Sequence, residues 1–266
     1  MKIKTNGIET NYVIEGDGPW LVMSHSLASN LTMWDAQAKL LARDFKVLRY
    51  DTRGHGGSNA PAGPYTLDQL ADDAKALLDA LGITRAHWVG LSMGGMIGET
   101  VALKYPGVFE SMVLADTTAR RPPNAAEMWG ERIRIAQAQG MSALVESTLA
   151  RWFTEPFRES RKDVMELIGG HIRNTPVAGF VGCCEAISRV DVLDRLHEIR
   201  CPALVIVGEQ DHGTPPEMAR AIAANLPGAK LVIIPSAAHF SNVEQERAFN
   251  DALLPFLASV RSTGAR

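Results

Sequence analysis

The sequence "HWVGLSMGGM" (residues 87–96) places a single serine, Ser92, among several glycines directly after an apolar run. Its centre, "GLSMG" (90–94), is a Gly-x-Ser-x-Gly pattern between a predicted strand and a predicted helix. A sharp strand-to-helix turn forces the serine into a strained backbone conformation, and side chains two positions before and after it would collide. The pattern therefore predicts a nucleophile elbow with Ser92 as the nucleophile. The alternative is a glycine-rich turn with an unreactive serine.

Short apolar runs alternate with amphipathic stretches on both sides of this elbow. The stretch 66–82 carries leucine and alanine on one helical face and ends at Gly82, so it predicts a helix. Such alternation predicts an α/β fold with a mostly parallel sheet flanked by helices. Residues 1–16 predict a hairpin at one edge, which brings the expected sheet to eight strands. The other expected strands are 20–26, 46–51, 87–92, 111–116, 203–209 and 230–236.

The alternation stops between Thr117 and Arg195, where no strand-like run occurs. Proline and glycine divide this segment into several helical stretches, which contain Trp129, Trp152, Phe153, Phe157 and Phe180. We therefore expect a helical cap over residues 117–195, inserted into a core made of residues 1–116 and 196–266.

The composition narrows the kinds of partner. The chain has 266 residues and a formal net charge of −3, and no run of lysine and arginine indicates nucleic-acid binding. No apolar segment is long enough for a membrane span, and residues 1–16 do not have the pattern of a signal peptide. We expect a cytoplasmic protein with a small-molecule partner and no nucleic-acid or membrane partner, and its oligomeric state stays open.

A serine hydroxyl needs a base, and the base needs an acceptor that orients it. His239 follows the last strand-like run, so it lies at the sheet edge where Ser92 is expected. Asp211 follows the preceding strand, and the order Ser92, Asp211, His239 is that of α/β-hydrolases. Asp116 and Glu209 are the rival acids. The pattern predicts a catalytic triad that requires neither a cofactor nor a metal.

A tetrahedral intermediate also needs hydrogen-bond donors for its oxyanion. The backbone N–H that follows the nucleophile, at Met93, is one expected donor. The second is expected in the loop "SHSLAS" (24–29), where we favour the backbone N–H of Leu27.

Several stretches resemble the α/β-hydrolase superfamily and, within it, the 3-oxoadipate enol-lactonases. The loop "SHSLAS" is similar to the lactonase sequence Ser-Asn-Ser-Leu-Gly but departs from it at His25 and Ala28. The resemblance implies hydrolysis of a small lactone that carries a carboxylate, in the breakdown of aromatic compounds. The stretches that carry it are "GLSMGG" (90–95), "GEQD" (208–211), "AAHFSNVE" (237–244), "YDTRGHGGSNAPAGPYTLDQLADD" (50–73), "ARWFTEPF" (150–157) and "GCCEAIS" (182–188).

The substrate carboxylate that this resemblance implies requires a cationic partner where water is excluded. Most cap arginines are expected at the surface, but Arg151 adjoins Trp152 and Phe153 and is the preferred candidate. Trp152, Trp129 and His25 are further candidates for contacts with the substrate, although cap aromatics also serve packing. The arginines considered are Arg132, Arg134, Arg151, Arg158, Arg161 and Arg173.

Other functions are compatible with the same pattern. A broad-specificity carboxylesterase would use the same triad with a less selective cap. A carbon–carbon bond hydrolase of ring-cleavage products, a cofactor-free perhydrolase or haloperoxidase, and a ligand receptor built on a hydrolase scaffold are further alternatives. The departures at His25 and Ala28 border the expected oxyanion loop, so they bear first on the choice of substrate.

Overall fold

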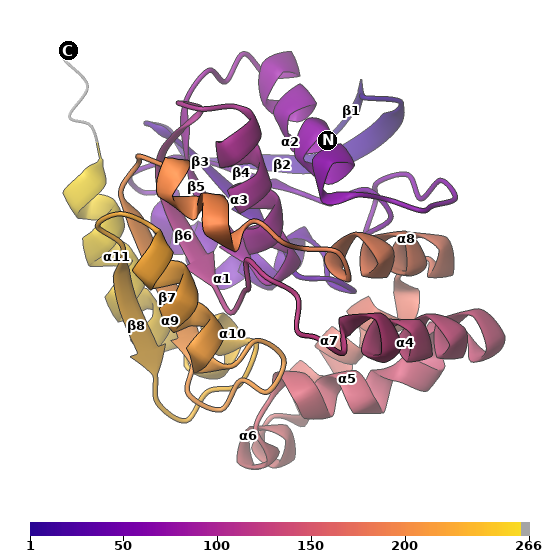
Figure 1. The fold of residues 1–266 in the computed structure, drawn as a ribbon. Coiled ribbons are helices and arrows are strands. Elements are labelled where there is room, and N and C mark those ends of the chain that lie inside the picture. The colour runs from indigo at the N-terminus through magenta and orange to yellow at the C-terminus, as the bar shows by residue number, and fades with distance from the viewer. Residues whose placement is uncertain (262–266) are drawn as a thin grey trace.

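The computed structural model describes residues 1–261 and contains one eight-stranded sheet (Figure 1). The strand order is β1-β2-β4-β3-β5-β6-β7-β8, with parallel pairing from β4 to β8 and antiparallel pairing of β2 with β1 and β4. The eight-stranded, mostly parallel sheet predicted from the sequence is confirmed. The strands are β1 (Lys2–Thr5), β2 (Ile8–Glu15), β3 (Trp20–Ser24), β4 (Lys46–Tyr50), β5 (Ala86–Leu91), β6 (Phe109–Ala115), β7 (Ala203–Gly208) and β8 (Lys230–Ile234).

The central strands are buried on both faces, which explains why they are continuous apolar runs. Every residue of β5 and β7 is buried. In the edge hairpin, β1 alternates exposed and half-buried positions, and the first half of β2 alternates buried positions with more exposed ones. Parallel strands covered by helices on both sides need this composition, because neither face of the sheet meets water.

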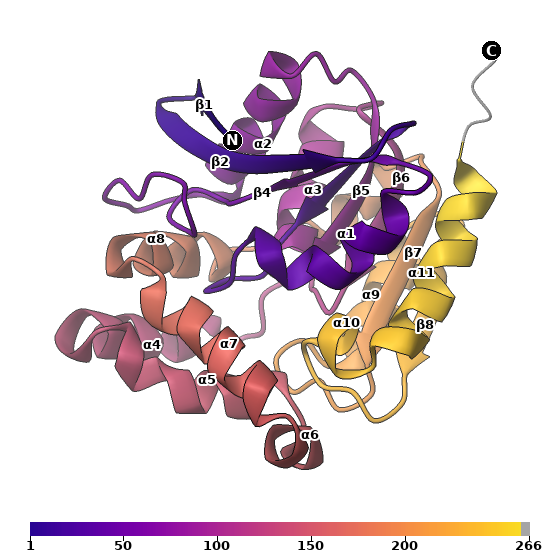
Figure 2. The same cartoon turned by 180° about the vertical axis from the view of Figure 1, so that it is seen from behind.

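Helices cover both faces of the sheet (Figures 1 and 2). The helix expected over 66–82 is present, and its first turn is capped by the hydroxyl of Thr66, which accepts a hydrogen bond from the backbone N–H of Gln69. One face carries α2 (Leu67–Ala80), α3 (Met93–Lys104) and α9 (Pro216–Asn225), and the other carries α1 (Asp35–Leu41) and α11 (Glu246–Val260). Two short helices, η1 (Leu31–Trp34) and α10 (Ser241–Glu244), precede α1 and α11.

Between β6 and β7 the chain forms the predicted helical layer, which lies beyond one edge of the sheet (Figure 1). At its base, Arg120 pairs with Asp191 in an isolated bridge and forms ion pairs with Asp191 and Asp194. The segment η3 (Leu193–Glu198) packs against α3 and α9 of the core. The cap elements are α4 (Ala125–Gln139), η2 (Met141–Leu144), α5 (Val145–Trp152), α6 (Glu155–Ser160), α7 (Lys162–Asn174) and α8 (Val177–Ile187).

The cap contacts the core closely at one pair of glycines. Gly54 has a φ of +83°, and a Cβ added to Gly179 of α8 would lie 2.0 Å from the Gly54 carbonyl oxygen. Both residues are therefore restricted to glycine by the approach of the two backbones.

No helix within residues 1–261 is long and apolar enough to cross a membrane.

The close approach of Gly54 and Gly179 predicts that two glycine substitutions in cap helices change the free energy of unfolding in opposite directions. Gly179→Ala should lower the free energy of unfolding by about 1–3 kcal/mol, because the new methyl group collides with backbone. Gly170→Ala in α7, where no atom lies within 4 Å of the added Cβ, should instead stabilise the protein by roughly 0.5–1 kcal/mol. Urea unfolding of both variants checks this, and equal effects would contradict the close approach.

Candidate active site

Ser92 lies at the sharp turn between β5 and α3, with φ 54° and ψ −115°. A Cβ added to Gly90 would lie 2.3 Å from the carbonyl oxygen of Gly94, and one added to Gly94 would lie 2.2 Å from the carbonyl oxygen of Ser24. The steric reason inferred from the sequence for glycine at these two positions is therefore present in the structure. Such a backbone conformation costs about 1–3 kcal/mol and persists only because the surrounding packing imposes it.

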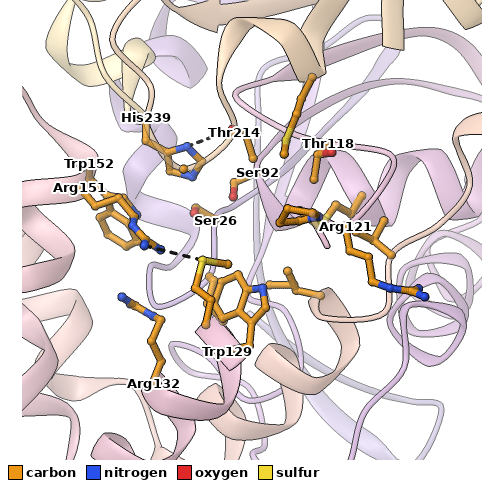
Figure 3. Close-up of a pocket in the computed structure, with 18 of the residues that line it drawn as sticks. Ser26, Ser92, Thr118, Arg121, Trp129, Arg132, Arg151, Trp152, Thr214 and His239 are labelled. Carbon is orange, nitrogen blue, oxygen red and sulfur yellow. Dashed lines mark hydrogen bonds between the residues drawn. The ribbon is translucent and has the colours of Figure 1, made fainter. Parts of the chain in front are cut away.

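His239 and Asp211 lie together at the same edge of the sheet, in the loops after β8 and β7. His239 Nδ1 is 2.8 Å from Asp211 Oδ2, and both side chains are buried. The other carboxylate oxygen, Oδ1, accepts hydrogen bonds from the backbone N–H groups of Gly213 and Thr214. The Thr214 hydroxyl donates to Oδ2 at 2.7 Å and lies 3.3 Å from His239 Nδ1 (Figure 3).

These contacts decide the protonation of the pair. Burial raises the pKa of Asp211, but the charge of His239 and the hydrogen bonds from His239 and Thr214 outweigh it, so the pKa is lowered overall. An ionised carboxylate can only accept hydrogen bonds. His239 Nδ1 therefore carries a hydrogen and donates a hydrogen bond to Asp211 Oδ2. His239 Nε2 is then left as an acceptor, and Figure 3 shows the Ser92 hydroxyl close to the ring in the view of the pocket.

Asp116, the first rival acid, ends β6 but is bonded differently. Its Oδ1 accepts the N–H of Gly208 at 2.8 Å, and its Oδ2 is 2.5 Å from the hydroxyl oxygen of Ser241. Burial and the neighbouring Asp211 raise the pKa of Asp116 well above its usual value. The hydrogen bonds of its carboxyl group join β6 to β7 and α10. Glu209, the second rival, is exposed and accepts a bond from the Ser236 N–H.

The loop after β3 supplies backbone N–H groups beside Ser92. The N–H of Ala28 donates to His55 Nε2 at 2.9 Å, and that of Ser26 donates to the thioether of Met33 at 3.3 Å. Within residues 1–261 the N–H groups of Leu27 and Met93 donate to no protein acceptor. Among residues 1–261 neither expected oxyanion donor is bonded to a protein acceptor. The N–H of Ser26 has only a weak sulfur acceptor.

His25 lies behind the pocket rather than in its lining, so the structure does not support its expected contact with the substrate. Its Nδ1 donates to the carbonyl of Ser26 at 2.7 Å and its Nε2 accepts the N–H of Thr52 at 2.9 Å. Burial lowers the pKa of His25 and also lowers that of His55, to about 3. Both rings are neutral and hold the Ser26–Ala28 backbone against the neighbouring loop.

Ser92 and His239 line a pocket between the core and the cap (Figure 3). Its space, including open solvent at the mouth, is about 700 Å³, and residues of both the core and the cap line it. The predicted residues Trp129, Trp152 and Arg151 all line it. Trp152 also stacks on Phe240 at 4.2 Å between ring centroids and packs beside the His239 ring.

Arg132 lines the same pocket, although the sequence grouped it with arginines expected mostly at the surface. Its guanidinium donates to the Thr148 hydroxyl at 2.9 Å, while its Nε is buried without a partner among residues 1–261. The only hydrogen bond of the Arg151 guanidinium in that range is a 3.8 Å contact with Met128 Sδ. Burial and the charge of Arg151 lower the pKa of Arg132. Within the described chain neither arginine has a carboxylate partner.

The loop that carries His239 is bonded directly to the cap. Glu244 accepts hydrogen bonds from the N–H and hydroxyl of Thr154 and, through its other oxygen, from the N–H of Ala238 at 2.8 Å. The N–H of Phe240 donates to the carbonyl of Trp152 at 3.1 Å. The cap residues that line the pocket are therefore fixed relative to the histidine.

Comparisons with known proteins place the chain in a family. Residues 19–246 match the family described as alpha/beta hydrolase fold, so the chain belongs to that family. It is 37% identical over 248 residues to 3-oxoadipate enol-lactonase 2 of Acinetobacter baylyi, with 92% of each chain covered. The fold class and the resemblance to enol-lactonases expected from the sequence are confirmed.

Two solved structures are also similar to this chain. One is the enol-lactonase from Burkholderia xenovorans LB400, with a TM-score of 0.94, 39% identity and coverage of 97% of this chain and 100% of that one. The other is a thermophilic esterase from Thermogutta terrifontis, with a TM-score of 0.93, 30% identity and coverage of 98% and 100%. The similarity extends through both the sheet and the cap.

The bonding of Asp116 predicts a pH-dependent gain of stability in Asp116→Asn. The raised pKa means that the native state keeps a proton that the unfolded state releases near the ordinary value of 3.8. The free energy of unfolding of the wild type therefore falls as pH rises above about 4, by up to about 1.4 kcal/mol per pH unit, until the native acid ionises. Asparagine has no proton to lose. Its Oδ1 still accepts a hydrogen bond from the Gly208 N–H, and its Nδ2 can donate one to the Ser241 hydroxyl oxygen.

The difference in unfolding free energy between Asp116→Asn and the wild type should consequently grow from pH 4 to pH 7. Urea unfolding at several pH values measures it, and hydrolytic activity should be retained. A constant difference across this range, or a destabilised variant at neutral pH, would contradict a raised pKa of Asp116.

Proposed function

We propose that the protein is a serine hydrolase that cleaves a small carboxylic ester or lactone through an acyl-enzyme. The observation that carries this proposal is the juxtaposition of Ser92, on a strained elbow, with the bonded pair His239–Asp211 in one small-molecule pocket. A nucleophile, a base with a free acceptor nitrogen and a carboxylate that orients it are the three parts required for acyl transfer.

In the first half of the reaction, Ser92 Oγ attacks the substrate carbonyl carbon while His239 Nε2 takes its proton. The carbonyl π electrons move onto the oxygen, which the N–H groups of Met93 and the 26–27 loop stabilise, with Leu27 as the preferred donor. As the tetrahedral intermediate collapses, His239 returns the proton to the departing alcohol or enol oxygen. For a lactone, that oxygen stays attached to the acyl group on Ser92.

In the second half, water replaces the serine as the attacking group. His239 Nε2 accepts a proton from the water, whose oxygen bonds to the acyl carbon and forms a second oxyanion intermediate. Collapse breaks the bond to Ser92 Oγ, and His239 protonates the serine again. Asp211 stays ionised throughout and stabilises the imidazolium that forms in each half.

The pocket favours a substrate with its own negative charge. Arg132 and Arg151 come from α4 and α5 and line one pocket, without a carboxylate partner among residues 1–261. Two neighbouring cations repel each other, and burying them is unfavourable unless an anion joins them. A substrate carboxylate supplies that anion and accepts charge-assisted hydrogen bonds from both guanidinium groups.

The names of the similar proteins support the same class of substrate. The relatives from Acinetobacter baylyi and Burkholderia xenovorans are enol-lactonases, and 3-oxoadipate enol-lactone combines a lactone with a free carboxylate. We therefore propose an enol-lactone of this type, formed during the breakdown of aromatic compounds, as the substrate. The similarity to an esterase makes a neutral carboxylic ester the second candidate.

Substitutions in the triad test the hydrolase proposal. Ser92→Ala should reduce turnover of a p-nitrophenyl ester to background, because no other group on the elbow is nucleophilic. Asp211→Asn should lower kcat by about 10⁴-fold, because the amide favours the wrong histidine tautomer. Initial rates and circular dichroism of both variants check this. Parent-level activity in Ser92→Ala, or a mild effect in Asp211→Asn, would remove that residue from the mechanism.

Substitutions in the cap test the substrate charge. Arg132→Ala and Arg151→Ala should each lower kcat/KM for a carboxylate-bearing enol-lactone by roughly 10- to 100-fold, matching about 1.5–3 kcal/mol for a charged hydrogen bond. Both should barely change kcat/KM for a neutral aryl ester. Arg134→Ala is the matched control, because Arg134 is an exposed residue of α4 outside the pocket.

Equal losses on both substrates would show that the two arginines support the cap rather than a carboxylate. A wild-type preference for neutral esters would favour the carboxylesterase alternative, while the triad proposal would be unaffected.

A further inference from the structure

The hydroxyl of Ser26 has no role in the site as described so far. Ser26 is 1% exposed, and its Oγ is buried without a hydrogen-bond partner among residues 1–261. The residue nevertheless lines the same pocket as Ser92 and His239. In Figure 3 the hydroxyl groups of Ser26 and Ser92 both point into the cavity, near the His239 ring. A buried, unpaired hydroxyl is unfavourable in the free protein and needs a reason.

The backbone of Ser26 is held firmly, so this hydroxyl is fixed in place. The Ser26 carbonyl accepts hydrogen bonds from His25 Nδ1 at 2.7 Å and from the N–H of Ser29 at 3.3 Å. Two positions further on, the N–H of Ala28 is bonded to the buried ring of His55. The loop that carries the expected oxyanion donor Leu27 therefore presents the Ser26 side chain in a preorganised way.

We propose that the Ser26 hydroxyl donates a hydrogen bond to the oxyanion of the tetrahedral intermediates, as a side-chain donor beside the backbone N–H groups. This inference rests on the proposed acyl transfer at Ser92. It adds a catalytic residue, because the Ser26 hydroxyl then touches the reacting oxygen of the substrate. A hydroxyl without a protein acceptor supplies this bond without breaking another one.

The bond is stronger in the transition state than with bound substrate. When Ser92 Oγ bonds to the carbonyl carbon, the π electron pair moves onto the carbonyl oxygen and the serine proton moves to His239 Nε2. The Ser26 O–H then faces a full negative charge instead of a neutral carbonyl, and charge-assisted hydrogen bonds are roughly twice as strong. An interaction that strengthens in this way raises kcat and leaves KM nearly unchanged.

Ser29 provides a matched control in the same loop. It is also 1% exposed, and its hydroxyl is also buried without a partner within the described chain. However, Ser29 does not line the pocket. Removing either hydroxyl takes one buried oxygen out of the same loop, so an effect on folding or loop rigidity would appear in both variants.

The test compares Ser26→Ala and Ser29→Ala with the wild type on a p-nitrophenyl ester. Ser26→Ala should lower kcat by about 10- to 100-fold, at or below the range for the loss of one oxyanion donor, with little change in KM. The inhibition constant of an aryl trifluoromethyl ketone, which forms a charged tetrahedral adduct with the active serine, should rise by a similar factor. Ser29→Ala should match the wild type in kcat, KM and inhibition.

Three results would overturn the proposal. One is an unchanged kcat in Ser26→Ala, and the second is a rise in KM with kcat intact, which would assign Ser26 to ground-state binding. The third is an equal loss of kcat in Ser29→Ala. Activity in Ser92→Ala would instead overturn the proposed acyl transfer, so the two failures are distinguishable.

Discussion

The sharp turn at Ser92 is the constraint around which the site is organised. A serine with φ 54° and ψ −115° is strained, and the turn exists only because Gly90 and Gly94 let the backbone approach within distances that no side chain permits. The same turn ends β5 and begins α3, so it fixes the serine at the carboxyl edge of the sheet. The parallel register of β5 to β8 brings the loops of Asp211 and His239 to that edge.

Most of the fold follows from local patterns in the sequence. The buried strands are short runs rich in β-branched residues, and the missing strand signal between β6 and β7 marks the helical layer. The site at the sheet edge is equally readable, because residues directly after parallel strands meet there. The chain order Ser92, Asp211, His239 favours Asp211 as the acid, and Asp116 and Glu209 remain rivals at the same edge. The contacts distinguish the two buried acids, because Asp211 is bonded to His239 and Asp116 to Gly208 and Ser241.

The sequence is less informative about side chains that depend on tertiary contacts. Arg132 lies on a helix whose inward face is set by packing against α8, so its position in the pocket has no clear local signal. His25 belongs to the loop after β3, but its ring points toward the loop that contains Thr52. Both of its ring nitrogens form hydrogen bonds with backbone groups. Ser26, its neighbour, faces the cavity instead. The two neighbouring side chains therefore have different roles, which the contacts of the loop after β3 decide.

The cap and the core form a single unit around the pocket. The Phe240 N–H bonds the His239 loop to the Trp152 carbonyl at the end of α5, and Glu244 bonds the same loop to Thr154, two residues further on. The two pocket arginines lie on α4 and α5. Arg151 lies on the helix whose Trp152 carbonyl is bonded to the His239 loop. A substrate carboxylate held by Arg151 would therefore be positioned relative to the base through α5.

Covalent labelling with a fluorophosphonate tests most directly whether Ser92 is an activated nucleophile. The reagent phosphonylates a serine only where a base removes its proton and donors stabilise the oxyanion-like adduct. Mass spectrometry of the tryptic digest should show one label per chain, on the peptide of residues 86–104, with Ser92 as the modified residue. The extent of labelling should parallel the loss of ester hydrolysis. A label on another residue, or full ester hydrolysis by unlabelled protein after prolonged exposure, would contradict the mechanism.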